Sequence, residues 1–212
     1  MSAICVENVK KRFGEDEILK GICREFEEGK IHGIVGNNGS GKTVLMKCIC
    51  GFIQPNEGRI TVQGKVIGKE LDFPEDIGII IETPGFLPNL TGVKNLKILA
   101  SLRRRIDEEE IRNVIRRVGL NPDLKKPVSK YSLGMRQRLG IAQAIMEKPS
   151  ILILDEPFNG LDKSGVEHMR GLIKELKGDG KTILLASHNQ QDIDELCDTV
   201  CEMDAGVMTM LR

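Results

Sequence analysis

The segment Gly36-Asn37-Asn38-Gly39-Ser40-Gly41-Lys42-Thr43 limits the possible folds of this chain more than any other stretch. It matches the spacing Gly-x-x-x-x-Gly-Lys-Ser/Thr, in which glycines allow backbone N–H groups to turn inward around phosphate oxygens. A short apolar run at residues 31–35 precedes it, and a helical pattern at residues 42–50, ended by Gly51, follows it. A strand, this loop and a helix in that order predict an α/β core that binds a nucleotide phosphate at the positive end of the helix.

Two side chains of this loop are candidates for direct chemistry. Lys42 is expected to contact the β- and γ-phosphates, and the Thr43 hydroxyl is expected to ligate Mg²⁺. A glycine-rich turn without a ligand is the alternative, but the flanking strand and helix disfavour it. The loop residues predicted to contact the nucleotide are Gly36, Asn37, Asn38, Gly39, Ser40, Gly41, Lys42 and Thr43.

A second aliphatic run, at residues 150–154, ends at the acidic pair Asp155-Glu156. Such a bare aliphatic strand is typical of a parallel sheet that is covered on both faces. Asp155 at the strand end can reach a metal ion through a water molecule. Glu156, one position further, is the candidate for positioning or deprotonating an attacking water. Acidic pairs are often caps, but a phosphate-binding loop in the same chain favours the catalytic interpretation.

Composition argues against several classes of function. The chain has 212 residues, enough for one domain with a sizeable core, and its 31 Lys and Arg balance its 31 Asp and Glu. A formal charge of zero gives no sign of a nucleic-acid partner. No apolar run approaches the roughly 18 residues that cross a bilayer. Residues 1–12 alternate in polarity and do not resemble a secretory signal. If this protein serves a membrane process, another subunit is expected to span the membrane.

The cysteines form no Cys-x-x-Cys pair and lie within apolar runs without His or Asp companions at metal spacing. We therefore expect buried, reduced thiols in a reducing cytosol rather than disulfides or metal ligands. The six positions are Cys5, Cys23, Cys48, Cys50, Cys197 and Cys201.

Hydrophobic periodicity changes along the chain. The N-terminal part is rich in β-strands, at residues 3–13, 18–26 and 59–65. Residues 91–120 have helical periodicity, with an apolar stripe of Leu96, Leu99 and Leu102 and with Asp107 as the N-cap of a second helix. We expect a helical lobe, at about residues 88–145, inserted into the α/β core.

The C-terminal third again has an α/β pattern. Residues 163–177 are amphipathic and predict a helix, and residues 182–186 predict an aliphatic strand. The chain is expected to close with a hairpin around Ala205-Gly206, formed by strands at residues 199–204 and 207–211.

The motif Ser132-Leu133-Gly134-Met135-Arg136-Gln137 lies between the phosphate-binding loop and the acidic strand. By itself it would be an ordinary helix start with Ser132 as N-cap. In this order, the three motifs resemble those of the ATP-binding cassette (ABC) ATPases. The resemblance implies that Ser132, Gly134 and Gln137 contact the γ-phosphate of an ATP held by Lys42 of a second copy. The chain would then carry two half-sites that are completed in a head-to-tail dimer, most simply a homodimer.

Three further positions match the family pattern. Asn159-Gly160-Leu161-Asp162 resembles the D-loop, which implies that Asp162 connects the two nucleotide sites. His188 follows a predicted strand and matches the histidine that contacts the γ-phosphate; a lone histidine would otherwise be structural or exposed. Phe13 occupies the position of the aromatic residue that stacks on adenine, with a core phenylalanine as the alternative.

Glu82 departs from the family pattern, in which glutamine is usual at this position and touches Mg²⁺ and the membrane subunit. A carboxylate can still ligate Mg²⁺, so the predicted metal ligands are Thr43, Glu82 and Asp155. Residues 82–91, Glu-Thr-Pro-Gly-Phe-Leu-Pro-Asn-Leu-Thr, resemble the bacitracin and lantibiotic exporter branch of ABC ATPases. A neutral local variation at Glu82 is the alternative.

The resemblance implies a single ABC ATPase domain over residues 1–212. Its α/β fold would have a P-loop NTPase core with a mixed sheet, an N-terminal antiparallel β subdomain and the inserted helical lobe. Such a subunit binds ATP and Mg²⁺ and hydrolyses ATP with Lys42, Glu156 and His188 in catalytic roles.

The same resemblance implies that the subunit drives a separate membrane-spanning permease from the cytoplasmic face, with membrane contact only through that partner. Export of a peptide antibiotic or a similar compound is the transport function it suggests. The alternatives are a cytosolic ABC ATPase that acts on a soluble partner and a module that senses ATP without hydrolysing it.

Overall fold

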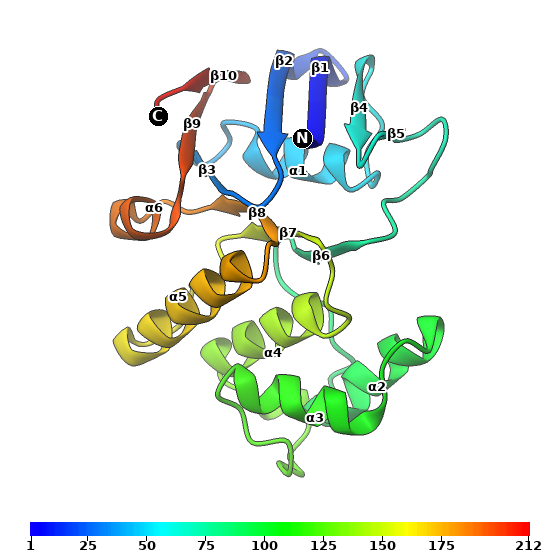
Figure 1. Ribbon diagram of the computed structural model, residues 1–212, viewed down its shortest axis with the longest axis vertical. Helices are drawn as coiled ribbons and strands as arrows, with labels where there is room; N and C mark the ends of the chain where they lie inside the picture. The colour runs from blue at the N-terminus through cyan, green and yellow to red at the C-terminus, as the bar shows by residue number, and fades with distance from the viewer.

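The computed structural model describes residues 1–212 and contains two β-sheets with helices around them (Figure 1). The larger, six-stranded sheet has the order β10-β9-β3-β8-β7-β6. All neighbouring strands in it are parallel except β9 and β10, which form an antiparallel hairpin. Its strands are β3 (Ile31–Val35), β6 (Ile77–Ile80), β7 (Ile151–Asp155), β8 (Thr182–Ala186), β9 (Thr199–Asp204) and β10 (Val207–Met210).

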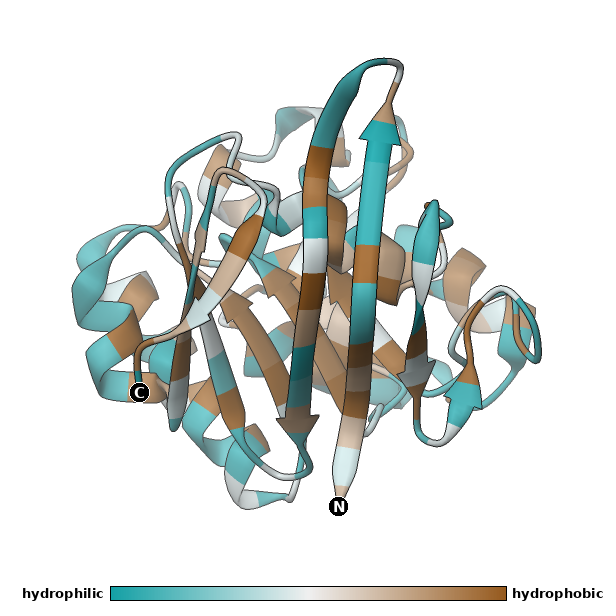
Figure 2. Ribbon diagram, turned by 90° about the horizontal axis from the view of Figure 1, so that it is seen from above, coloured by the Kyte–Doolittle hydropathy of each residue, from teal (hydrophilic) through white to brown (hydrophobic).

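The smaller, four-stranded sheet is antiparallel with the order β2-β1-β4-β5. Its long strands β1 and β2 form a hairpin whose far end is hydrophilic, whereas the strands of the larger sheet are mostly hydrophobic (Figure 2). The strands of a parallel sheet are covered on both faces by other elements, so their side chains are apolar on both sides, whereas an antiparallel sheet can expose one face to solvent. The strands are β1 (Ser2–Phe13), β2 (Asp16–Glu27), β4 (Glu57–Val62) and β5 (Lys65–Val66).

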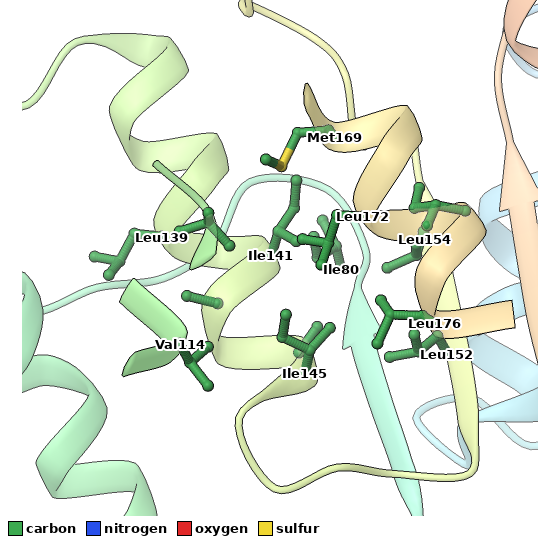
Figure 3. Close-up of a cluster of buried hydrophobic side chains, with 14 of the residues drawn as sticks. Ile80, Val114, Leu139, Ile141, Ile145, Leu152, Leu154, Met169, Leu172 and Leu176 are labelled. Atoms are coloured by element: carbon green, nitrogen blue, oxygen red, sulfur yellow. The ribbon is translucent and has the colours of Figure 1, made fainter. Parts of the chain in front are cut away.

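Helix α1 (Lys42–Ile49) lies between the two sheets. Its Leu45 and Met46 are fully buried, in one cluster with Ile4 of β1 and Leu184 of β8. The opposite face of the larger sheet is covered by α5 (Lys163–Gly178), whose apolar side packs on Leu152 and Leu154 (Figure 3). Helix α6 (Gln190–Leu196) follows β8.

The predicted helical lobe contains α2 (Gly92–Arg103), α3 (Glu108–Arg117), the short 3₁₀ helix η1 (Val128–Lys130) and α4 (Leu133–Ile145). Helix α4 approaches β6 closely, because a Cβ atom at Gly78 would lie 1.9 Å from the carbonyl oxygen of Ala144. The lobe shares its core with α5 and the larger sheet, as the contacts among Leu139, Ile141, Ile145 and Met169 illustrate (Figure 3).

The predicted mixed sheet, antiparallel N-terminal sheet and helical lobe are all present. The stripe predicted on α2 is wrong at one position, because Leu102 is 78% exposed whereas Leu96 is fully buried. The prediction of buried thiols is wrong for Cys23, which is exposed on β2, although all six cysteines are free. Burial raises the pKa of Cys48 to about 11 and that of Cys50 to about 12, so both remain protonated thiols at neutral pH. None of the helices combines the length and apolar character that a membrane span requires.

Candidate nucleotide-binding site

The phosphate-binding loop connects the carboxyl end of β3 to α1, and its backbone requires glycine. Gly36 has a φ angle of +140°, and a Cβ atom there would lie 2.1 Å from the carbonyl oxygen of Met203. Gly41, at the start of α1, has a φ angle of +106°, a conformation that other residues rarely adopt. The Ser40 hydroxyl is buried and has no hydrogen-bond partner in the protein. A buried, unpaired donor beside a helix N-terminus fits an anion such as a nucleotide phosphate.

A cavity of about 390 Å³ opens at this loop, which is within the range of small-molecule sites. Phe13, at the end of β1, lines it and is 48% exposed, so the interpretation of Phe13 as a core residue is wrong. Its ring is available for stacking, and Lys11 Nζ lies 5.1 Å from the ring centroid. The other lining residues are Ile18, Asn38, Gly39, Ser40, Gly41, Lys42, Thr43, Val44, Asp155 and Glu156.

Lys42 and Thr43 are fixed at the base of the cavity. Lys42 Nζ donates hydrogen bonds to the carbonyl oxygens of Gly36 and Asn37, at 2.6 and 3.0 Å. The Thr43 hydroxyl donates to Asp155 Oδ2 at 2.7 Å. Two of the predicted metal ligands thus lie together at the carboxyl ends of β3 and β7. Hard oxygen donors of this kind suit Mg²⁺, which is usually held by few protein groups together with substrate phosphates.

Glu156 directly follows β7 and has a φ angle of +50°, which is unusual for a residue with a side chain. Its N–H donates to the carbonyl oxygen of Ala186 at 3.0 Å, and its carbonyl oxygen accepts from Gln137 Nε2 at 3.2 Å. Its carboxylate lies 2.8 Å from Nδ1 of His188. The structure therefore brings His188 into contact with Glu156, which lines the cavity, although the two residues are 32 positions apart in sequence.

Glu82 does not lie with the predicted metal ligands. Its Oε1 pairs with Lys47 Nζ at 2.7 Å, and Glu82 lines a separate groove between β6 and α4. Lys47 lies on α1 beyond Thr43, so its opposite charge holds the carboxylate outside the nucleotide cavity. No sequence pattern predicts this pairing, because the two residues are 35 positions apart.

The remaining predicted contacts form a second cluster, outside the cavity. Ser132 is exposed, and its hydroxyl caps α4 by accepting a hydrogen bond from Met135 N at 3.2 Å. A Cβ atom at Gly134 would lie 2.7 Å from the carbonyl oxygen of Gly160, so α4 starts against the 159–162 loop. Asp162 caps α5 through Gly165 N, and hydrogen bonds from Ser164 and Gly165 lower the pKa of its carboxyl group.

Gln137 does not belong to this exposed cluster. It is buried on the inner side of α4, where its amide supports the backbone of Glu156. The prediction that Gln137 contacts nucleotide together with Ser132 and Gly134 is therefore not supported by its placement. In a helix, a residue five positions after the cap has turned well away from the cap's direction, which explains the difference.

Comparison with known proteins now identifies the family. Residues 19–159 match the family described as ABC transporter. The chain belongs to the ABC transporter family. It is an ATP-binding cassette and an ATP hydrolase of that family, as the order of its motifs predicts.

Three relatives place this cassette more closely. The "Uncharacterized ABC transporter ATP-binding protein YybJ" of Bacillus subtilis is 44% identical over 95% of this chain and 92% of its own length. The bacitracin transport ATP-binding protein BcrA of Enterococcus faecalis is 41% identical over 94% of this chain, which spans only 66% of BcrA. The lantibiotic transport ATP-binding protein SrtF of Streptococcus pyogenes is 36% identical over 92% of this chain and 84% of SrtF. The predicted resemblance to the bacitracin and lantibiotic branch is confirmed.

The fold agrees with that of a solved cassette. A structure described as the ATP-binding subunit of an ABC transporter is 26% identical and superposes with a TM-score of 0.87, covering 99% of this chain and 90% of the other. The predicted ABC cassette fold is therefore confirmed.

Proposed function

We propose that this cassette drives a separate membrane-spanning permease from the cytoplasmic side, and that the transported compound is a peptide antibiotic or a chemically similar molecule. The observation that carries the proposal is the convergence of Lys42, Thr43, Asp155 and Glu156 on one cavity in an ABC transporter cassette, with His188 in contact with Glu156. The names of BcrA and SrtF, which concern bacitracin and lantibiotic transport, support the class of substrate.

In the proposed mechanism, the γ-phosphate of ATP lies against Lys42 and the N–H groups of the phosphate-binding loop. Glu156 accepts a proton from the attacking water, and the imidazole of His188 fixes the direction of the Glu156 carboxylate. Thr43 and Asp155 would hold Mg²⁺, which, when bound, neutralises charge on the β- and γ-oxygens. Lys42 stabilises the charge that develops on the transferred phosphoryl group.

The separation of the two clusters supports a head-to-tail dimer. Ser132, Gly134 and Asp162 do not line the cavity of their own chain, and they are grouped where α4 and α5 begin. The neighbouring Leu133 is 52% exposed. In the proposed dimer, Ser132 and the start of α4 face the γ-phosphate bound to the other copy, so the positive end of the helix meets the anion.

The groove that contains Glu82 supports a permease contact. Besides Lys47 and Glu82, it is lined by Phe52, by the rest of the 79–85 segment, and by Gly140 and Gln143 of α4. Phe52 and the nearby Phe73 are 52% and 56% exposed, with ring centroids 6.1 Å apart. Exposed aromatic rings beside a groove of mixed polarity are typical of a surface that a partner covers.

Hydrolysis by Glu156 is tested by the Glu156→Gln variant. The amide is nearly isosteric but cannot accept the proton, so we expect ATP binding within about twofold of wild type. Turnover is expected to fall by about 10²–10⁴-fold, the usual contribution of a general base. Glu175→Gln, at an exposed carboxylate paired with Arg117, is the control and should leave turnover unchanged. Wild-type turnover in Glu156→Gln, free of contaminating ATPase, would contradict the assignment.

The permease is tested by isolating the tagged cassette from gently solubilised membranes of its own cell. We expect a polytopic membrane protein in stoichiometric amount. Its loss from a Phe52→Asp variant that retains ATP binding would locate the contact at the groove. Recovery of only a soluble partner would instead support the alternative of a cytosolic ABC ATPase that acts on a soluble partner.

A further inference from the structure

Helices α5 and α6 are joined by a buried ion pair that the proposed mechanism does not use. The Arg170 side chain on α5 and the Asp192 side chain on α6 are only 3% and 2% exposed. Arg170 Nε and Nη2 both donate to Asp192 Oδ1, at 2.9 and 2.5 Å. Arg170 also pairs with Glu167 and Glu195 at the edge of the cluster.

This ion pair is not the only contact that holds α5 on the sheet. The helix already buries Met169, Leu172, Ile173 and Leu176 against the core. Buried ion pairs contribute little net stability, because desolvation of both charges offsets their attraction, and some of them specify one arrangement instead. The Arg170–Asp192 pair can therefore specify one position of α6 relative to α5.

The second carboxylate oxygen of Asp192, Oδ2, connects the ion pair to the backbone beside His188. Asp192 Oδ2 accepts a hydrogen bond from the Ser187 hydroxyl at 2.9 Å, and Ser187 Oγ accepts from the N–H of Asn189 at 3.1 Å. Ser187 and Asn189 flank His188. The backbone on both sides of this histidine is thus tied to the buried ion pair through one hydroxyl group.

His188 itself has little other support. Its side chain is 68% exposed, and its hydrogen-bonding contact within the chain is the 2.8 Å contact with Glu156. An exposed imidazole has many rotamers, so its position depends on the backbone that carries it.

We propose that Arg170 is a positioning residue for ATP hydrolysis, which acts through Asp192 and Ser187 to fix His188 against Glu156. The inference rests on the roles proposed above for Glu156 and His188. Asp192 is the acceptor that connects Arg170 to Ser187, and Ser187 transmits the position of α6 to the residue beside it. Displacement of a catalytic group by about 1 Å can lower a rate by about 10²-fold.

The test uses Ser187→Ala, because removing Arg170 alone would leave the Asp192 charge buried and could unfold the chain. Ser187→Ala keeps the ion pair and deletes only the hydroxyl that connects it to the backbone at His188. A second variant, Arg170→Met with Asp192→Leu, removes both charges together. Lys174→Met is the matched control, because Lys174 lies on the same helix and pairs with Glu195 in an exposed position.

The chain contains three histidines, so the imidazole signal of His188 can be followed by NMR separately from those of His32 and His168. We expect Ser187→Ala and the double variant to move the His188 signal and leave the other two in place. Their kcat should fall by about tenfold, while the Kd for ATP stays close to wild type. Ser187→Ala should remain folded, with a melting temperature lowered by only a few degrees because Asp192 Oδ2 loses one donor. Lys174→Met should change none of these quantities.

Unchanged His188 signals, or a kcat within twofold of wild type in both variants, would overturn the inference. His188→Ala separates this failure from that of the proposed mechanism. If His188→Ala is fully active, the catalytic role of His188 is wrong and the inference falls with it. If His188→Ala is inactive while the two variants are fully active, only the positioning role of Arg170 is wrong.

Discussion

At the scale of single residues, Glu156 shows how a backbone conformation directs a side chain. Its φ angle of +50° turns the residue sharply out of the line of β7. Such conformations cost on the order of 1–3 kcal/mol and persist only where the surroundings enforce them. Here the backbone is held on both sides, by Ala186 of β8 and by Gln137 of α4. The carboxylate is thereby kept at the cavity beside His188.

The Lys47–Glu82 pair is expected to affect metal use. Lys47→Met should release the Glu82 carboxylate, which can then approach the cation near Thr43. Because exposed ion pairs are worth at most about 1 kcal/mol, the Mg²⁺ concentration for half-maximal ATPase should fall by no more than about fivefold. The measurement is a Mg²⁺ titration of ATPase activity. The Lys47→Met, Glu82→Ala double variant is the control, and an equal decrease in it would exclude Glu82 as the cause.

Asp198 is expected to make stability depend on pH. Partial burial raises the pKa of this carboxyl group. Hydrogen bonds from Lys177 and the N–H of Ile31 together lower the pKa by more than burial raises it, so the net pKa lies below its usual value. A lowered folded pKa contributes stability above the unfolded pKa of about 3.9, and this contribution is lost as pH falls through the folded pKa.

We therefore expect Asp198→Asn to lower the free energy of unfolding by on the order of 1 kcal/mol at pH 7. The difference from wild type should shrink below about pH 4, where the wild-type carboxylate becomes protonated in the unfolded chain. Urea unfolding between pH 3 and pH 7 measures this. A difference that is independent of pH would show that charge is not the reason.

At the scale of elements, the start of α3 illustrates local coding. Asp107 Oδ1 accepts from Glu110 N at 2.8 Å, and Glu110 Oε2 accepts from Asp107 N at 3.4 Å, which forms a capping box. Three glutamates in the first turn also meet the positive end of the helix. All of these contacts join residues that are at most four positions apart, so the local sequence alone specifies the contacts.

Asp107→Ala should destabilise the chain by about 1 kcal/mol, the usual loss for an N-cap, because the N–H of Glu110 loses its side-chain acceptor. Thermal or urea unfolding measures the change. Glu109→Gln, which removes an exposed pair with Arg116 and one of the three first-turn charges, should lower stability by only about 0.5 kcal/mol. Equal losses in both variants would attribute the effect to charge and not to the cap.

At the scale of the whole molecule, the dominant feature is that the predicted active-site residues form two clusters. Lys42 and Glu156 line the cavity and His188 contacts Glu156, whereas Ser132 and Asp162 lie outside the cavity. The larger sheet positions the first cluster at the carboxyl ends of its parallel strands. The starts of α4 and α5 position the second. A chain with this arrangement cannot bring Ser132 to its own Lys42 without changing the packing of α4 against β6.

The proposed head-to-tail dimer predicts that the ATPase activity per molecule rises with protein concentration, because in that arrangement a monomer holds only half of each site. Glu156→Gln should accumulate as a dimer with ATP, which size-exclusion chromatography detects, since it binds but does not hydrolyse the nucleotide. A specific activity that is constant from nanomolar to high micromolar protein, with a monomer at every concentration, would rule out the shared site.

Sequence patterns determined much of this molecule. Strands β3 and β8 have the predicted bounds, and Asp107 caps α3 as predicted. Helix α1 and the C-terminal hairpin each end within one residue of the predicted position. The phosphate-binding loop and the Asp155-Glu156 pair were found because their chemistry requires fixed residues at fixed spacing. These features depend on neighbours in the chain or on strands that are apolar throughout.

Only the tertiary structure decided the remaining features. Strand β6 was not predicted, since Gly78 interrupts its apolar run to admit α4. The pairing of Glu82 with Lys47, the burial of Gln137 and the Arg170–Asp192 pair all join residues at least 19 positions apart. Periodicity and motif spacing report on local geometry, whereas such contacts depend on how separate elements pack. The sequence thus specified the chemical groups of the site, and the packing of α1, α4, α5 and α6 determined which of them meet.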